Sequence, residues 1–250
     1  MIALITGATS GFGKAIALKF AEEGYDVIIS GRRTGRLHEL EKIIQTKYKV
    51  KVISLSFDVR NKNEVALQLN SLPQEWKLID VLINNAGLAS GLSDIQDANT
   101  DDWDVMIDTN VKGLLYVSRV VLPWLIERKQ GHVINIGSTA AKEVYAKGNV
   151  YCASKHAVDA ISKGMRIDML PHGIKVTCVN PGAAETEFSV VRFKGDTERA
   201  AQVYQGFEPL NAEDVADIVY FAASRPKNVV MNDIVITPLA QATSSNIVRK

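Results

Sequence analysis

Residues 2–14 read Ile-Ala-Leu-Ile-Thr-Gly-Ala-Thr-Ser-Gly-Phe-Gly-Lys, and this stretch decides the fold class. The apolar run Ile2–Ile5 predicts a strand buried on both faces, and a helical pattern begins just after the glycines. Gly7 permits a tight turn out of the strand, Gly11 lets the backbone approach a pyrophosphate, and Gly13 lets the helix pack closely on the sheet. Free N–H groups at the helix N-terminus attract phosphate. The stretch therefore predicts a dinucleotide site rather than an ordinary glycine turn.

The rest of the chain alternates short β-branched runs with amphipathic stretches. The predicted strands are Ile2–Thr6, Asp26–Ser30, Lys51–Phe57, Val81–Asn84, His132–Ile136, Lys175–Asn180 and Ile234–Thr237. The predicted helices are Phe12–Glu23, Thr34–Tyr48, Lys62–Leu72, Thr100–Lys129, Val150–Leu170 and Ala212–Ala223. Such alternation is typical of right-handed βαβ units in a doubly wound parallel sheet. We expect one α/β domain over residues 1–250, with an irregular substrate loop over 182–211 and a tail over 238–250.

The composition excludes several classes of protein. The 250 residues carry 29 Lys and Arg against 28 Asp and Glu, so neither a nucleic acid nor a membrane surface is an expected partner. Two cysteines cannot build a disulfide framework or a four-ligand zinc site, and the histidines lack metal-ligand spacing, so we expect no metal. The first apolar run is too short for a signal peptide. A cytoplasmic protein is the resulting expectation.

Two arginines follow the second predicted strand. An NAD site usually carries an acid near this point to hold the ribose 2′-hydroxyl, but no acid occurs between Val27 and Arg33. A guanidinium grips a 2′-phosphate through two hydrogen bonds. Arg32 and Arg33 therefore favour NADP over NAD; the alternative is a solvated arginine pair at a strand end.

Two further strand ends carry polar residues at the same expected edge of the sheet. Asp58 follows the third strand and would accept a hydrogen bond from an adenine amino group; it would equally serve as a helix N-cap. Asn84-Asn85-Ala86-Gly87 ends the fourth strand. In open α/β sheets, ligands bind at this carboxyl edge.

Tyr151 and Lys155 are the predicted chemical pair. On a helix, residues i and i+4 share a face, and a Lys ammonium there would lower the tyrosine pKa from about 10 toward neutrality. Alone, the pair would read as two exposed polar residues. Ser138 lies at the end of a strand, thirteen residues before Tyr151. This strand end and the start of the following helix are expected to meet at the cofactor edge of the sheet, which favours a catalytic role for the pair. Asn110 lies inside a long helical pattern, where it would be either a surface residue or a residue that holds a local helix irregularity and a water.

Taken together, these residues resemble the short-chain dehydrogenase/reductase family along essentially the whole chain. The resemblance implies a Rossmann-type seven-stranded sheet and a tetrad of Asn110, Ser138, Tyr151 and Lys155. It implies that Tyr151 is the general acid/base, that Lys155 lowers its pKa and holds the nicotinamide ribose, that Ser138 binds the substrate oxygen and that Asn110 anchors a water. The cofactor residues so predicted are Thr6, Gly7, Thr9, Ser10, Gly11, Phe12, Gly13, Arg32, Arg33, Asp58, Val59, Asn85, Ala86, Gly87, Tyr151, Lys155, Pro181, Gly182 and Thr186.

Residues 135–140 and 186–196 look like those of the NADP-dependent 3-hydroxy acid dehydrogenases. That branch, which includes serine dehydrogenases and malonic semialdehyde reductases, implies a homotetramer and a small anionic hydroxy acid as substrate. The sequence is also similar to the sulfoacetaldehyde reductases, which likewise use an anionic aldehyde. Ala183-Ala184 departs from the bulkier apolar pair expected after Pro181-Gly182, which leaves the pocket size open.

The charged end of such a substrate needs a cation, because a buried unpaired carboxylate is very costly. Arg192 lies in the most family-like stretch, and Tyr145 lies on the loop between Ser138 and Tyr151. We predict that both contact the substrate. The alternatives are a solvated or inter-subunit Arg192 and, for the whole protein, a non-catalytic NADP-sensing module, which would be expected to have lost Tyr151 or Lys155.

Overall fold

A computed structural model describes all 250 residues and contains one seven-stranded parallel sheet. The strands are β1 (Ile2–Ile5), β2 (Asp26–Gly31), β3 (Val52–Ser56), β4 (Val81–Asn84), β5 (His132–Ile136), β6 (Lys175–Pro181) and β7 (Asp233–Ile236). Their order is β3-β2-β1-β4-β5-β6-β7. The first three strands are added outward from β1 toward one edge of the sheet, and the last four are added from β4 toward the other edge. The connection from β3 to β4 therefore crosses back to the middle of the sheet. All seven predicted strands are confirmed, with ends shifted by one residue at most.

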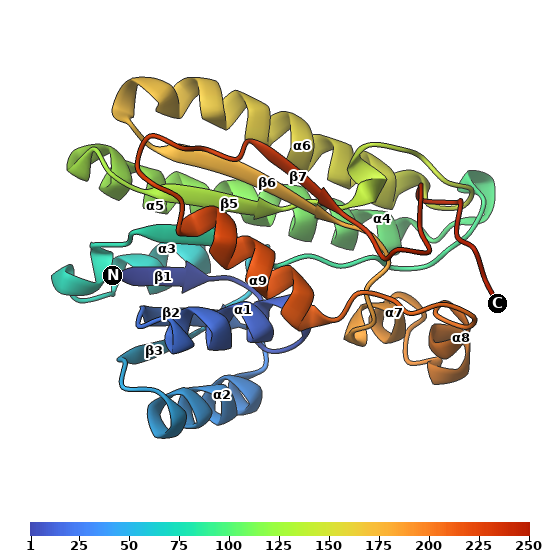
Figure 1. The fold of residues 1–250 in the computed structure, drawn as a ribbon, viewed down its shortest axis with the longest axis horizontal. Helices are drawn as coiled ribbons and strands as arrows, with labels where there is room; N and C mark the ends of the chain where they lie inside the picture. The colour runs from blue at the N-terminus through green and yellow to red at the C-terminus, as the bar shows by residue number, and fades with distance from the viewer.

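Helices cover both faces of the sheet (Figure 1). They are α1 (Gly11–Glu22), α2 (Thr34–Lys47), α3 (Lys62–Asn70), α4 (Thr100–Ile107), α5 (Leu114–Arg128), α6 (Asn149–Met169), α7 (Glu187–Arg192), α8 (Thr197–Gln202) and α9 (Ala212–Ala223). Short 3₁₀ turns occupy Gln74–Lys77, Ile95–Asp97, Thr139–Ala141 and Leu170–His172.

Alternate residues of each central strand enter two separate cores. Ala3 and Ile5 of β1 pack with α1, α2 and α9, whereas Leu4 packs with α3, α5 and α6. All three side chains are completely buried. Each fully buried aliphatic side chain contributes about 1.5–3 kcal/mol, which explains why the central strands show no polar alternation in sequence.

The predicted helix Thr100–Lys129 is confirmed as a helical stretch, which ends at Arg128, but it is not α-helical throughout. A π-helical turn, Asp108–Gly113, separates α4 from α5. Asn110 sits in that turn with its side chain bonded to both backbone groups of Leu88: its Oδ1 accepts from the Leu88 N–H and its Nδ2 donates to the carbonyl, each at 2.8 Å. These bonds draw the wide turn toward the loop after β4, which fulfils the expected local irregularity.

The segment after β6 is more ordered than its sequence indicates. It contains α7 and α8, which lie beyond the carboxyl ends of the strands, and the C-terminus ends beside them (Figure 1). The tail after β7 packs on this segment through Gln241, whose Oε1 accepts from the Ala183 N–H, and through Arg249, which donates to the carbonyls of Val203 and Gln205. None of the helices combines the length and the apolarity needed to cross a membrane.

Candidate active site and cofactor cleft

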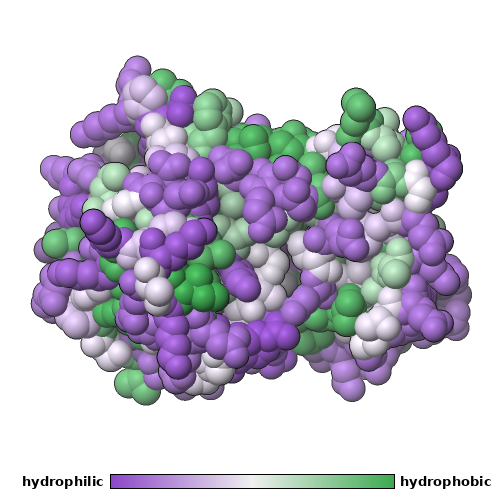
Figure 2. Space-filling view, turned by 60° about the horizontal axis from the view of Figure 1, so that its bottom comes forward, coloured by the Kyte–Doolittle hydropathy of each residue, from purple (hydrophilic) through white to green (hydrophobic).

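A cleft runs along the carboxyl edge of the sheet, between the loops after β1, β2 and β4 on one side and α7 on the other. Figure 2 shows a hollow near the middle of the face that it presents, with hydrophilic side chains around the rim. The predicted cofactor residues that line the cleft are Gly7, Thr9, Ser10, Gly11, Phe12, Arg32, Arg33, Asp58, Val59, Asn85, Ala86, Gly87, Tyr151, Lys155 and Thr186. Thr6 and Gly13 lie behind it in the packing, and Pro181 and Gly182 line the adjoining pocket instead.

The floor of the cleft is a cradle that only glycine permits. Gly7 and Gly11 have φ angles of +69° and +49°, which favour glycine. A Cβ on Gly13 would collide with the Gly7 carbonyl and the Asn85 side chain. Asn85 fixes this loop by donating from Nδ2 to the Thr6 carbonyl at 2.8 Å. A backbone this open, ahead of the α1 N-terminus, fits a dinucleotide pyrophosphate.

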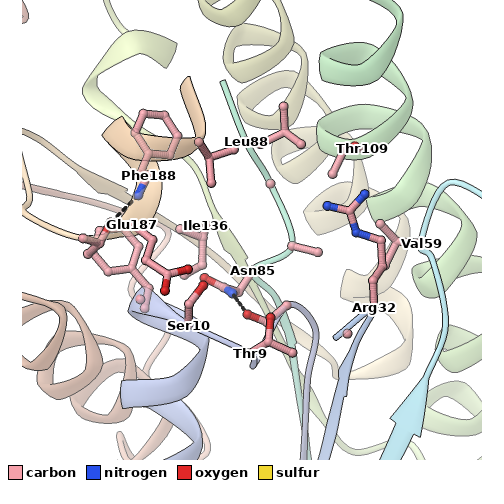
Figure 3. Close-up of a pocket in the computed structure, with 18 of the residues that line it drawn as sticks. Thr9, Ser10, Arg32, Val59, Asn85, Leu88, Thr109, Ile136, Glu187 and Phe188 are labelled. Carbon is pink, nitrogen blue, oxygen red and sulfur yellow. Dashed lines mark hydrogen bonds between the residues drawn. The ribbon is translucent and has the colours of Figure 1, made fainter. Parts of the chain in front are cut away.

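Arg32 and Arg33 flank the cleft from the end of β2. Arg33 donates to the hydroxyls of Thr9, from Nε at 3.0 Å, and Ser10, from Nη2 at 2.6 Å. Figure 3 shows Arg32 beside Val59, across the pocket from Ser10. An Arg32 nitrogen lies 3.7 Å from an Asp58 oxygen. The two guanidiniums thus bracket the end of the cleft where the adenosine ribose of a bound dinucleotide would lie.

Asp58 lines the cleft and does not cap a helix. The cap of α3 is Asn61, whose Oδ1 accepts from the N–H groups of Asn63 and Glu64. The Asp58 carboxylate instead binds Arg60, with the shortest bond at 2.6 Å. Burial acts to raise the pKa of Asp58, but the hydrogen bonds from Arg60 outweigh it, so the pKa lies below its ordinary value.

Tyr151 and Lys155 project from α6 to the inner end of the cleft, where both are buried, with 8% and 6% exposure. Lys155 donates from Nζ to the Ile136 carbonyl at 2.9 Å. Burial lowers the pKa of Lys155 to about 8. Ser138 lines the adjoining pocket together with Tyr151. The tetrad members Ser138, Tyr151 and Lys155 therefore converge at one place.

The expected direct effect of Lys155 on the tyrosine is wrong for this structure. Burial raises the pKa of the Tyr151 phenol above its ordinary value, and Tyr145 adds to the rise. The Lys155 ammonium lies 6.0 Å from the centre of the Tyr151 ring and is bonded to a backbone carbonyl. Desolvation therefore exceeds any attraction across that gap.

Asn110 stands behind the cleft rather than in its wall. Besides its bonds to Leu88, its Nδ2 donates to the Ser154 hydroxyl at 3.0 Å, and that hydroxyl donates to the Tyr151 carbonyl at 2.7 Å. Asn110 is 2% exposed. Its side chain thus joins the π-helical turn, the loop after β4 and the helix that carries Tyr151.

A second pocket opens beside Tyr151 and contains the three predicted substrate residues, Ser138, Tyr145 and Arg192. The Arg192 guanidinium lies 5.5 Å from the ring centre of Tyr145 and 5.8 Å from that of Tyr151. Its Nε donates to the Gly91 carbonyl, while its buried Nη2 has no hydrogen-bond partner. The pocket wall therefore carries a guanidinium beside both tyrosine rings, with one buried nitrogen that has no hydrogen-bond partner.

Sequence reasoning missed several side chains of the two pockets. Glu187 lines the cleft and pairs with Arg33 and Arg36. Tyr204 of the second pocket donates to the Ala184 carbonyl, and Gln241 reaches that pocket from the tail. No local pattern marks these residues, because loop packing alone brings them there.

Comparison with known proteins identifies the family. The family model described as short chain dehydrogenase matches residues 1–196. The NADP-dependent 3-hydroxy acid dehydrogenase YdfG of Salmonella typhi is 45% identical over 243 residues, covering 97% of this chain and 96% of the relative. The NADP-dependent 3-hydroxy acid dehydrogenase of Schizosaccharomyces pombe is 41% identical over 248 residues, covering 99% of this chain and 96% of the relative.

A solved structure, the closed form of serine dehydrogenase complexed with NADP+, superposes with a TM-score of 0.93 at 44% identity, and each chain is covered completely. Serine dehydrogenase from Escherichia coli gives a TM-score of 0.82 at 40% identity, with 97% of this chain and 100% of that chain covered. Fold, cradle and relatives agree, and the chain is a member of the short-chain dehydrogenase family.

Proposed function

We propose that this enzyme transfers a hydride between NADP(H) and a small anionic 3-hydroxy acid or its semialdehyde, such as serine or 3-hydroxypropionate. The observation that carries the substrate class is the Arg192 guanidinium, which lines the pocket beside Tyr151 and whose buried Nη2 has no hydrogen-bond partner. Relatives that align along nearly the full chain act on 3-hydroxy acids by name. An NADP-sensing module without turnover is disfavoured, because Tyr151 and Lys155 are both retained.

The cofactor supplies or accepts the hydride when bound. The cradle of Gly7 and Gly11 would hold its pyrophosphate, and Lys155, through Nζ, would hold the nicotinamide ribose. Tyr151 donates its phenolic proton to the carbonyl oxygen during reduction and removes it from the hydroxyl during oxidation. The Ser138 hydroxyl holds that same oxygen in place. Asn110 keeps α6 and the loop after β4 in register, so that these groups stay aligned.

The charged end of the substrate is expected to bind Arg192. A carboxylate in a pocket lined by Tyr145, Tyr151 and Phe188 would be strongly destabilised without a partner. A planar guanidinium with a free nitrogen supplies one through charge-assisted hydrogen bonds. Because the guanidinium lies 5.8 Å from the Tyr151 ring centre, the rest of a three-carbon acid held there would lie beside Tyr151.

Arg192→Ala is the test of the substrate class. We expect the KM for L-serine or 3-hydroxypropionate to rise about 10- to 100-fold, because a charge-assisted hydrogen bond contributes about 1.5–3 kcal/mol. The KM for a neutral alcohol of similar size should change little. Steady-state kinetics followed by NADPH absorbance measures both.

Arg199→Ala provides the matched control for this experiment. Arg199 lies on α8 in the same segment and stacks on Phe193, outside both pockets. Its removal should leave KM unchanged. An Arg192→Ala enzyme that loses neutral and anionic substrates equally would assign Arg192 to loop folding, and unchanged kinetics would remove it from the site.

A sulfoacetaldehyde reductase is the second candidate function. A guanidinium binds a sulfonate as well as a carboxylate, and the small side chains of Ala183 and Ala184 in the pocket wall suit a larger tetrahedral headgroup. Comparing kcat/KM for sulfoacetaldehyde and for malonic semialdehyde decides between the two. A preference for sulfoacetaldehyde of more than about tenfold would replace the carboxylate proposal.

Cofactor choice is expected to depend on Arg32 and Arg33. Replacing both with Ala should lower kcat/KM for NADP about 10- to 100-fold while changing the value for NAD by less than about twofold, since only NADP carries the 2′-phosphate. A wild-type enzyme that uses NAD equally well would contradict the assignment.

We further propose, from the family resemblance, that the enzyme is a homotetramer located in the cytoplasm. The exposed apolar side chains of Phe221 on α9 and Val235 on the edge strand β7 are consistent with contacts between subunits. Light scattering coupled to size-exclusion chromatography measures the oligomeric state.

A further inference from the structure

A carboxylate stands against the arginines at the adenosine end of the cofactor cleft. Glu187, the first residue of α7, accepts from Arg33 Nη1 at 2.9 Å and from Arg36 Nη1 at 2.5 Å. Both arginines belong to the segment between β2 and the first turn of α2. Figure 3 shows Glu187 on the side of the pocket where Ser10 lies. Glu187 therefore links α7 to α2 across the end of the cleft.

The bonds of Arg33 leave almost none of its donors free. Its Nε and Nη2 donate to the Thr9 and Ser10 hydroxyls, and Nη1 donates to Glu187. A phosphate that binds Arg33 must replace some of these acceptors. Among them Glu187 is the only anion, so it is the acceptor that a second negative charge repels.

Glu187 is held in place and kept ionised at this position. The α7 N-cap, Thr186, lies against the glycine turn: a Cβ on Gly11 would come within 3.4 Å of the Thr186 Cβ. Partial burial acts to raise the pKa of Glu187, but the hydrogen bonds from Arg33 and Arg36 outweigh it and hold the pKa below its ordinary value.

We propose that Glu187 is an internal competitor of the 2′-phosphate: it occupies Arg33 and Arg36 in the free enzyme and must leave them when NADP(H) binds. A 2′-phosphate carries a charge of about −1.5 to −2 at neutral pH and displaces a single carboxylate. A ribose 2′-hydroxyl has no charge with which to do so. Glu187 thus sets the affinity for NADP(H) without affecting that for NAD, and Arg36 becomes a third phosphate-binding arginine once it is released. The inference rests on the proposed use of NADP, but not on the substrate.

Binding of adenosine 2′,5′-bisphosphate and of 5′-ADP to the full-length protein tests the proposal by calorimetry. Glu187→Gln should bind the 2′,5′-bisphosphate about three- to tenfold more tightly than wild type, as expected from losing two partly exposed ion pairs. Its Kd for 5′-ADP should stay within about twofold. Glu185→Gln is the matched control, because this exposed residue of the same loop forms no ion pair and lines neither pocket; its affinities should equal those of wild type.

The outcomes separate two failures. Equal or weaker binding of the 2′,5′-bisphosphate by Glu187→Gln, with wild type still preferring it over 5′-ADP, overturns the competitor role alone. A wild-type protein that binds the two nucleotides equally overturns the arginine-based preference for NADP, on which the proposal depends. A gain for 5′-ADP as large as that for the 2′,5′-bisphosphate also contradicts it, since the competition is for the 2′-phosphate.

Discussion

Tyr151→Phe is expected to lower kcat by about 10²–10⁴-fold, the usual contribution of a positioned general acid or base. The ring remains, so its edge-on packing against Phe188, with centroids 5.6 Å apart, is preserved. Only the hydroxyl that would exchange a proton with the substrate oxygen is lost. Steady-state turnover with NADPH measures the effect, and calorimetric titration with NADPH should give a Kd close to that of wild type.

Lys155→Met provides the contrast to that result. Lys155 has both a charge at the inner end of the cleft and a bond to the Ile136 carbonyl, so its loss should impair turnover and cofactor binding together. If Tyr151→Phe retained more than a few per cent of wild-type kcat, another residue would be the proton donor. If Tyr151→Phe lost cofactor affinity as strongly as Lys155→Met, the phenol would be acting in binding rather than in chemistry.

His132 is expected to make the free energy of unfolding depend on pH. It is 3% exposed, its ring nitrogen Nε2 lies 2.7 Å from the Thr177 hydroxyl and its Nδ1 has no partner. Burial, with a smaller effect of Lys175, lowers its pKa from 6.5 to about 3. Between pH 6.5 and about pH 3, His132 is therefore protonated in the unfolded chain and neutral in the folded protein. The free energy of unfolding is unaffected by His132 above pH 6.5. Below it, His132 lowers the free energy of unfolding by about 1.4 kcal/mol for each pH unit, or by about 3 kcal/mol at pH 4.

Urea unfolding followed by the fluorescence of the three tryptophans measures this slope between pH 7.5 and 4. His132→Gln keeps a polar group opposite Thr177 but cannot titrate. Its free energy of unfolding should therefore fall less steeply with decreasing pH than that of wild type, by about 1.4 kcal/mol per pH unit. His38→Gln, at an exposed position, should leave the slope unchanged. Parallel curves for wild type and His132→Gln would show that the buried imidazole is protonated in the folded state.

Local sequence patterns predicted most of the architecture correctly. Buried parallel strands are short apolar runs, as in Ile2–Ile5, and they differ plainly from the periodic helices between them. The comparisons confirm the resemblance to the short-chain dehydrogenases. The structure confirms the seven-stranded sheet and brings Ser138, Tyr151 and Lys155 together. The roles given to these residues remain predictions for the experiments above.

The errors arose where contacts between distant segments overrule local preference. The stretch Thr100–Lys129 has helical periodicity throughout, yet bonds between Asn110 and Leu88, 22 residues apart, widen it into a π-helical turn. The pKa of Tyr151 moves opposite to expectation because the pocket buries the phenol while Lys155 is held by the Ile136 carbonyl. Neither outcome depends on neighbouring residues in the sequence.

The sequence by itself determined the succession of strands and helices along the chain, the glycine cradle and the charged residues at each strand end. Each of these depends on residues within a few positions of one another. Only the tertiary structure decided which partners those charges have. Glu187 and Arg33 are 154 residues apart, yet they share a hydrogen bond across the cleft. Arg192 faces Tyr145 and Tyr151 with one nitrogen unpartnered because α7 folds over the pocket. The proposed cofactor affinity and substrate choice both depend on such long-range pairings, because burial and distance set the strength of each charge interaction.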